Sequence, residues 1–405
     1  MQDRPHPPLH NILLFLWIKI WGSSEISVRM LSVLASLFFL IVLYKAALML
    51  IPKWPSLFVV SICAFGSFFV YFGQQARPYA LVCLFATLTV YLLVRNRTKP
   101  SAVNAVLYFF SCAALVYTQY LGVLILLPQF AMIVFSGRPG QKKMLIYGFA
   151  GMLCIAFWLL LCSLYAPITE GIERVAWIGK PSPFDFASVF LAPFDFLPFE
   201  GSTRILITFI AVILSFLVIK RKDVDWEKVI LLGSLALFGP IVAFMASHVT
   251  SASAWADRQL IGSITFFICL LGFALALVPK WPRILLGLIL VVWSIFNVPN
   301  AFPENSKFPC RSVADSLSQK YPDHDIVVQT SGIGDMLDYY SNKKANIFGN
   351  ENLEKGAQCV FVSHHFLQEN VEEIEENYRI LEKQMISYGR EKEHSIRIYL
   401  LEKIN

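Results

Sequence analysis

Long apolar runs constrain this chain more than any other feature. Ten stretches are long and apolar enough to cross a bilayer, which takes about 17–25 residues of helix. They lie at 27–49, 56–74, 78–95, 102–118, 120–136, 144–165, 203–220, 228–248, 259–278 and 282–299. Because backbone groups in lipid must pair within their own segment, the runs predict an α-helical polytopic membrane bundle. The shorter run 11–22 predicts an interfacial or re-entrant helix.

The distribution of charge divides the chain. Only 15% of the 405 residues are charged, against about 25% in soluble domains. Residues 1–300 hold 22 Lys and Arg against 11 Asp and Glu, whereas residues 301–405 hold 12 against 17. This change predicts an extracytoplasmic segment with an interfacial helix at 1–26, a transmembrane domain at 27–300 and a soluble domain at 301–405. The cations lie in short loops between apolar runs, which argues against a nucleic-acid partner.

Lysines and arginines gather in alternate loops. They are Lys53; Arg95, Arg97 and Lys99; Arg138, Lys142 and Lys143; Lys220, Arg221 and Lys222; Lys280 and Arg283. The positive-inside rule assigns these loops to the cytoplasm. The other loops, residues 3–8 and the C-terminal domain are then extracytoplasmic. Because this map also puts the N-terminus outside, we expect an upstream helix that this chain lacks.

The C-terminal part predicts a small α/β domain. Residues 311–321 have helical spacing, residues 325–330, 358–363 and 395–401 are strand-like, and 369–376 form an acidic helix. Cys310 and Cys359 lie in this part. A disulfide between them and two unpaired thiols are both open.

Polar motifs interrupt the apolar pattern at predicted extracytoplasmic positions. They are D-R-P-H-P-P-L at 3–9, Y-F-G-Q-Q-A-R-P-Y-A-L at 71–81, Y-T-Q-Y-L-G at 117–122, W-I at 177–178 with P-S at 181–182, and R-S-V-A at 311–314. Arg77 stands at the head of a membrane helix. A guanidinium there suits a lipid phosphate, because it donates two parallel hydrogen bonds and stays charged. An arginine that only anchors a helix end is the alternative.

These motifs resemble those of bacterial GT-C-type glycosyltransferases of the protein O-mannosyltransferase, or family 39-like, superfamily. They occur in the same order along the chain and on the same side of the membrane. The resemblance spans nearly the whole chain. It implies a plasma-membrane enzyme that transfers a sugar, with inversion, from a dolichyl- or polyprenyl-phosphate donor to an extracytoplasmic protein, lipid or cell-envelope glycan. Such transfer needs a carboxylate to take the acceptor proton and a cation to hold the leaving phosphate.

The resemblance also implies roles for single residues. Arg77 and Arg258 are expected to hold the donor phosphate, His6 to face that phosphate or a divalent metal ion, and Gln75, Gln119, Tyr120 and Trp177 to bind substrate. The family has Glu and His where this chain has Gln75 and Gln119.

The general base is the least defined role. The family's acidic pair lies upstream of H-P-P-L, in a first loop that this chain lacks. Asp3 is therefore the candidate catalytic carboxylate, and the acids of the 166–202 loop, including Asp185, are the alternatives.

Two other functions compete with the enzyme. A non-catalytic lipid–sugar binding protein would keep the pocket without the base. A lipid-linked sugar transporter is less favoured, because charges such as Arg29, Lys45 and Arg204 lie at the ends of the spans and not near their centres.

Overall fold

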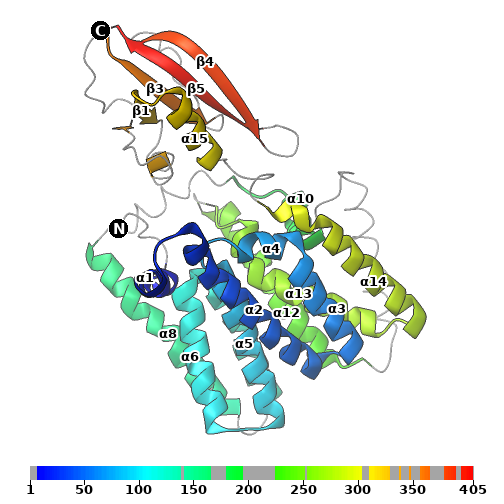
Figure 1. The fold of residues 1–405 in the computed structure, drawn as a ribbon. Coiled ribbons are helices and arrows are strands. Elements are labelled where there is room, and N and C mark those ends of the chain that lie inside the picture. The colour runs from blue at the N-terminus through cyan, green and yellow to red at the C-terminus, as the bar shows by residue number, and fades with distance from the viewer. Residues whose placement is uncertain are drawn as a thin grey trace. The chain divides into compact units, whose positions relative to one another are not determined.

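The protein is represented by a computed structural model. It describes residues 7–137, 141–165, 179–194, 224–250, 253–302, 310–328, 337–338, 346–347, 356–364, 378–388 and 394–404. The chain divides into two compact units, Met1–Pro299 and Asn300–Asn405. The first is helical and the second is built on a β-sheet (Figure 1).

Helices of the first unit follow the apolar runs of the sequence. They are α1 (Leu9–Trp21), α2 (Glu25–Leu50), α3 (Lys53–Phe65), α4 (Ser67–Gly73), α5 (Tyr79–Thr98), α6 (Ala102–Thr118), α7 (Val123–Ser136), α8 (Gln141–Tyr165), α10 (Pro183–Ser188), α12 (Trp226–Val249), α13 (Ile261–Ala276) and α14 (Lys280–Asn297). Short 3-10 turns are η1 (Tyr120–Gly122), η2 (Ala192–Phe194) and η3 (Asp257–Gln259). Nine of the ten predicted runs are helical, and the run 203–220 lies outside the described residues.

Several of these helices are long and apolar enough to cross a bilayer. Within the described residues, five helices meet this condition: α2, α5, α8, α12 and α14. The bent pair of α3 and α4 adds a sixth if it forms one span. The helices α6, α7 and α13 are apolar but shorter. The chain is therefore a multi-pass membrane protein, as the apolar runs predict.

The predicted span 56–74 is wrong in one respect, because it is broken. Helices α3 and α4 meet at a bend of 56°. Gly66 lies at the break, where an added Cβ would come within 2.5 Å of the Ile62 carbonyl oxygen. A glycine is needed there because of this close approach. The short α4 then ends at the turn 74–78, which leads into α5.

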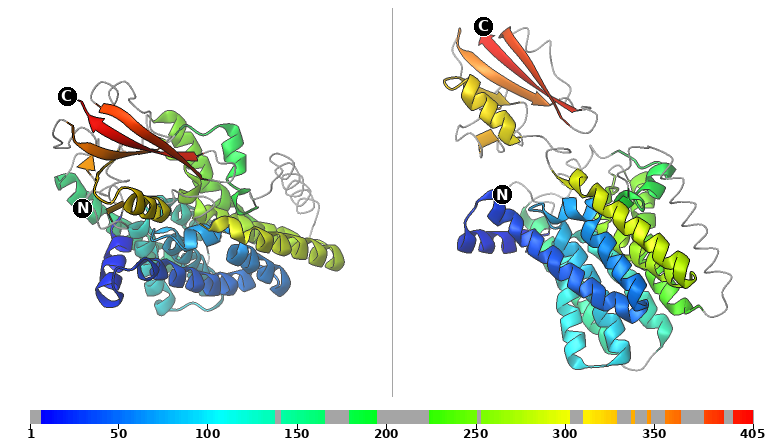
Figure 2. Two further views of the ribbon diagram at one scale, coloured as in Figure 1. Left: turned by 45° about the horizontal axis from the view of Figure 1, so that its top comes forward. Right: turned by 45° about the vertical axis from the view of Figure 1, so that its right-hand side comes forward.

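Close packing of the bundle depends on small residues at helix contacts. Helix α5 contacts α2, α6 and α13 and is the most enclosed of the five long apolar helices (Figures 1 and 2). Helix α8 packs on α6, where a Cβ at Gly148 would overlap the ring of Tyr108. A Cβ at Gly272 on α13 would likewise overlap Val59 on α3. Such contacts let membrane helices approach closely enough for dispersion forces to hold them.

One buried polar network joins three helices inside the bundle. The Tyr108 hydroxyl on α6 donates to Gln129 Oε1 on α7 at 3.1 Å, and Gln129 Nε2 donates to the Thr89 hydroxyl on α5 at 3.0 Å. All three side chains are buried. Because each polar group has a partner, the network fixes the register of α5, α6 and α7 without leaving an unsatisfied donor in an apolar environment.

The second unit is a mixed five-stranded sheet with strand order β2-β1-β3-β5-β4. Its described elements are α15 (Cys310–Lys320), β1 (Asp325–Val328), β2 (Asn346–Ile347), β3 (Gln358–His364), β4 (Tyr378–Tyr388) and β5 (His394–Lys403). Strand β1 is parallel to β2 and β3, and β5 is antiparallel to β3 and β4. Val313 and Leu317 of α15 share a buried core with Val360 of β3. Figure 1 shows α15 beside the sheet.

The predicted helix and three predicted strands of the C-terminal part are confirmed as α15, β1, β3 and β5. The sequence did not predict β2 or β4. The acidic stretch 369–376 lies outside the described residues, as does the side chain of Cys310. Cys359 is buried in the middle of the sheet on β3.

Candidate active site

Arg77 lies in the turn that joins α4 to α5. Its backbone N–H donates to the Gln75 carbonyl at 2.7 Å, and its own carbonyl accepts from the Ser32 hydroxyl of α2 at 3.4 Å. Pro78 follows, and α5 begins at Tyr79. The Arg77 side chain is exposed beside this helix N-terminus, where the helix dipole adds to its positive charge. An anion is therefore favoured at the turn.

The second predicted arginine, Arg258, reaches the same place from η3. Arg77 and Arg258 both lie within electrostatic range of the Tyr79 hydroxyl. Arg258 is also within electrostatic range of the hydroxyl of Tyr71 on α4. The Gln75 side chain faces the same hydroxyl. Both guanidinium groups thus act on the Tyr79 hydroxyl at the head of α5, and Arg258 acts on that of Tyr71 as well. This arrangement offers a phosphate several charge-assisted hydrogen bonds.

Gln119 attaches another part of the chain to this site. Its Nε2 donates to the Gln259 carbonyl at 3.1 Å, which links the corner after α6 to the segment that carries Arg258. Its Oε1 has no hydrogen-bond partner among the described residues. The hydroxyl of Tyr120 instead accepts from the indole N–H of Trp158 on α8 at 3.2 Å. The structure therefore connects Gln119 to the segment that carries Arg258, whereas the Tyr120 hydroxyl is engaged by Trp158.

Three predicted site residues, Asp3, His6 and Trp177, lie outside the described residues. Within the part of the chain that is described, no group of three or more His, Cys, Asp or Glu side chains could hold a metal ion.

His10 was missed by the sequence reasoning. It lies in the first turn of α1 with only 5% of its surface exposed. The ring faces the Ala76 backbone and is within electrostatic range of Arg77, but neither nitrogen has a hydrogen-bond partner of good geometry among the described residues. A buried donor without a partner costs about 1–3 kcal/mol. The sequence carries one signal for this residue, since His10 directly follows the H-P-P-L motif.

Asp185, one of the candidate acids of the 166–202 loop, has a structural role. Its carboxylate accepts from the backbone N–H and the hydroxyl of Ser182 at 2.7 and 2.8 Å, and Ser182 caps α10 in return. These hydrogen bonds hold the pKa of Asp185 below its usual range. A general base must gain a proton during the reaction, so this environment opposes that role.

The loop segment around α10 is fixed beside the Arg258 segment by aromatic contacts. The Phe186 ring lies 6.0 Å from that of Trp255 and 5.6 Å from that of Phe244 on α12. Trp255 is buried and precedes η3 by two residues. The contacts therefore place α10 next to the segment that presents Arg258.

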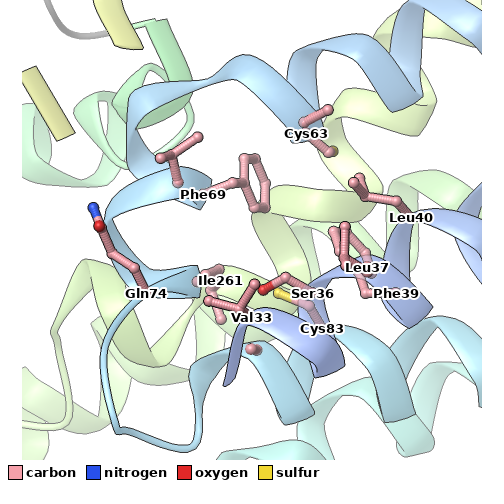
Figure 3. A pocket seen from close by; sticks show the side chains of 14 residues that line it. Val33, Ser36, Leu37, Phe39, Leu40, Cys63, Phe69, Gln74, Cys83 and Ile261 are labelled. Carbon is pink, nitrogen blue, oxygen red and sulfur yellow. The ribbon is translucent and has the colours of Figure 1, made fainter. Parts of the chain in front are cut away.

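An apolar cavity of about 200 Å³ lies beside the turn 74–78. Figure 3 shows Val33, Ser36 and Leu40 of α2 along one side, with Gln74 at one end. Gln74 and Ala80, which flank Arg77 in the sequence, both line it. An apolar cavity of ~150 Å³ can hold a molecule the size of benzene. This one can accept a short hydrocarbon segment next to the cationic site.

Comparison with known proteins identifies the fold. Residues 5–163 match the family model of dolichyl-phosphate-mannose-protein mannosyltransferase. The structure is similar to ArnT from Cupriavidus metallidurans in the apo state, with a TM-score of 0.61 and 12% identity over 97% of this chain and 87% of that one. The chain has the GT-C glycosyltransferase fold. For ArnT bound to undecaprenyl phosphate the TM-score is 0.59 and the identity 13%, over 98% and 88% of the two chains. A search of curated proteins finds no match.

The fold that the resemblance of the motifs implied is thus confirmed. The segment that the family model matches contains Arg77, Gln75 and Gln119. It stops before Arg258, whose connection to the site rests on the geometry around Tyr79.

Proposed function

We propose that the protein transfers a sugar from a polyprenyl-phosphate-linked donor to an acceptor outside the cytoplasm. The observation that carries this proposal is that Arg77 and Arg258 both lie within electrostatic range of Tyr79, at the head of a membrane helix. The apolar cavity beside the same turn supports a lipid-linked donor. The GT-C fold and the undecaprenyl phosphate of the similar ArnT structure agree with this class of donor.

The proposed reaction is a single displacement. The acceptor oxygen attacks the anomeric carbon, the bond from that carbon to the phosphate oxygen breaks, and the acceptor proton passes to a carboxylate. Attack from the face opposite the phosphate inverts the anomeric configuration. Negative charge grows on the departing polyprenyl phosphate, and the two guanidinium groups stabilise it in the transition state. Asp3 is the proposed carboxylate.

The remaining residues have binding roles in this proposal. Gln75 and Gln119 keep hydrogen-bonding capacity at the site and offer it to the sugar. Tyr120 and Trp177 supply aromatic surface to the substrate. The cavity holds the first part of the isoprenoid, because burying each CH₂ group of a lipid contributes about 0.8 kcal/mol.

The function is tested with purified protein in lipid nanodiscs. Native mass spectrometry measures binding of undecaprenyl phosphate, and radiolabelled undecaprenyl-phosphate sugars, offered with cell-envelope extract, measure transfer. Binding and transfer together support the proposal. Binding without transfer, for every sugar offered, supports the non-catalytic lipid–sugar binding protein. Absence of binding contradicts both.

We also propose a bacterial plasma-membrane location with the C-terminal unit outside the cytoplasm. Alkaline phosphatase fused after Asn405 is then expected to be active, because that enzyme folds only where its disulfides form. The alternating basic loops are the reason for this prediction. A fusion after Arg97, in a predicted cytoplasmic loop, is the matched control and should be inactive. An expressed but inactive fusion after Asn405 would reverse the assigned orientation.

A further inference from the structure

We infer that His10 is a positioning residue of the donor-phosphate site, whose ring holds the Ala76–Arg77 turn in place when Arg77 binds a phosphate. The inference rests on the proposed function. It adds a residue that no motif of the sequence assigned.

The first step concerns what holds α1. Leu13, one turn after His10, packs against a buried cluster that includes Ala80 and Leu81 at the start of α5. One turn further, the indole N–H of Trp17 donates to the Ser27 carbonyl of α2 at 2.9 Å. An apolar contact and a hydrogen bond thus fix the helix without help from His10. The buried imidazole, one turn before the first of these contacts, needs a different explanation.

The second step concerns the turn itself. On the α2 side the turn is held by a long hydrogen bond, from the Ser32 hydroxyl to the Arg77 carbonyl at 3.4 Å. On the α1 side the turn faces the His10 ring. The ring is oriented toward the Ala76 backbone, but neither of its nitrogens makes a hydrogen bond of good geometry there. A small movement of Ala76 toward the ring completes this bond. When Arg77 binds a phosphate, that interaction stabilises the position of the turn in which the hydrogen bond from His10 to Ala76 is formed.

The third step concerns charge. Burial lowers the pKa of His10 and the neighbouring Arg77 guanidinium adds to this, and together they outweigh the opposing effect of the Ala76 backbone. The ring is therefore neutral at neutral pH, with one N–H donor and one acceptor nitrogen. A neutral donor can hold the Ala76 carbonyl without placing a second positive charge against Arg77. A lysine at this position would repel the guanidinium that has to stay in place.

The test compares three variants of the full chain in nanodiscs, with undecaprenyl phosphate as the probe. His10→Phe keeps the ring volume but removes the donor, and its Kd is expected to rise about tenfold, the loss of one hydrogen bond. His10→Asn can still donate to Ala76 and should restore most of the affinity. Leu13→Ala, on the same face of α1, is the structural control: it should lower the melting temperature while leaving Kd unchanged.

A double-mutant cycle with Arg77 completes the test. If His10 acts through Arg77, then His10→Phe should not weaken binding further in an Arg77→Ala background. An unchanged Kd in His10→Phe, with a clear loss in Arg77→Ala, would overturn the role of His10 and leave the proposed function standing. An equal rise in Leu13→Ala and His10→Phe would also overturn it, as helix packing would then explain both. If Arg77→Ala binds like the wild type, the proposed function itself fails and His10 with it.

Discussion

Replacing Arg77 with alanine is expected to lower kcat/KM for sugar transfer by about 10²–10³-fold, the usual loss when one donor to a developing negative charge is removed. Arg77→Lys should recover only part of this. A lysine keeps the charge, but it cannot donate two parallel hydrogen bonds from a planar group. Steady-state transfer from a labelled polyprenyl-phosphate sugar measures both variants.

Arg95 offers a matched control at the far end of α5, the helix that follows Arg77. It lies in the last turn of α5, where it stacks on Tyr91 and donates to its hydroxyl at 3.1 Å. Arg95→Ala is expected to change activity by no more than about twofold, as surface substitutions usually do. Equal activity of Arg77→Ala and Arg95→Ala would refute the phosphate role.

The variant Arg258→Ala tests whether the two arginines form one site. We expect Arg258→Ala to lower kcat/KM by a factor similar to that of Arg77→Ala. The double variant should lose less kcat/KM than the product of the two single factors, because both side chains would hold the same phosphate. Arg29, which forms an ion pair with Glu25 at 2.5 Å, is the control for removing an arginine from the predicted outer face. Strictly multiplicative losses would mean that Arg77 and Arg258 act at separate places.

Asn in place of Asp3 is expected to lower kcat by about 10²–10⁴-fold, the contribution of a general base. KM for the donor should change little, because the base acts on the acceptor proton. The rate of sugar transfer under donor saturation is the measurement.

Asp185→Asn is the matched acidic control for Asp3. It removes a carboxylate from the same predicted side of the membrane, but one that caps α10. At neutral pH its transfer rate should stay near that of the parent, while protease cleavage around α10 increases. Because the folded-state pKa of Asp185 is lowered, the cap contributes stability at neutral pH and loses it as pH falls through that value. If Asp185→Asn lost activity and Asp3→Asn kept it, the two roles would be exchanged.

The sequence predicted the helices well because length and apolar composition nearly decide the structure of a membrane span. It could not predict the break at Gly66, since the run stays apolar on both sides and only the approach of the Ile62 carbonyl reveals the bend. Strand β4 was missed for a related reason. It is the edge strand of the sheet, with Glu382, Lys383 and Gln384 in sequence at its centre, so it lacks a clear apolar pattern.

The candidate site was predicted in part. The motifs pointed to Arg77 and Arg258, and the fold brings both to Tyr79. His10 was missed because its burial depends on how α1 packs against a turn far along the chain. The cap of α10 was readable from the sequence, as Ser182 precedes Asp185 by three residues.

The hydrogen bond from Gln119 has a consequence for sequence divergence. Its donor lies in the segment that matches the family model, whereas its acceptor is the main-chain carbonyl of Gln259, beyond that segment. A main-chain acceptor is present whatever side chain stands at that position. The later segment can therefore change residue by residue without detaching from the earlier one, provided that its backbone path is kept. Chimeras of two chains of this fold joined after residue 163 should preserve this connection even when their second parts share little sequence.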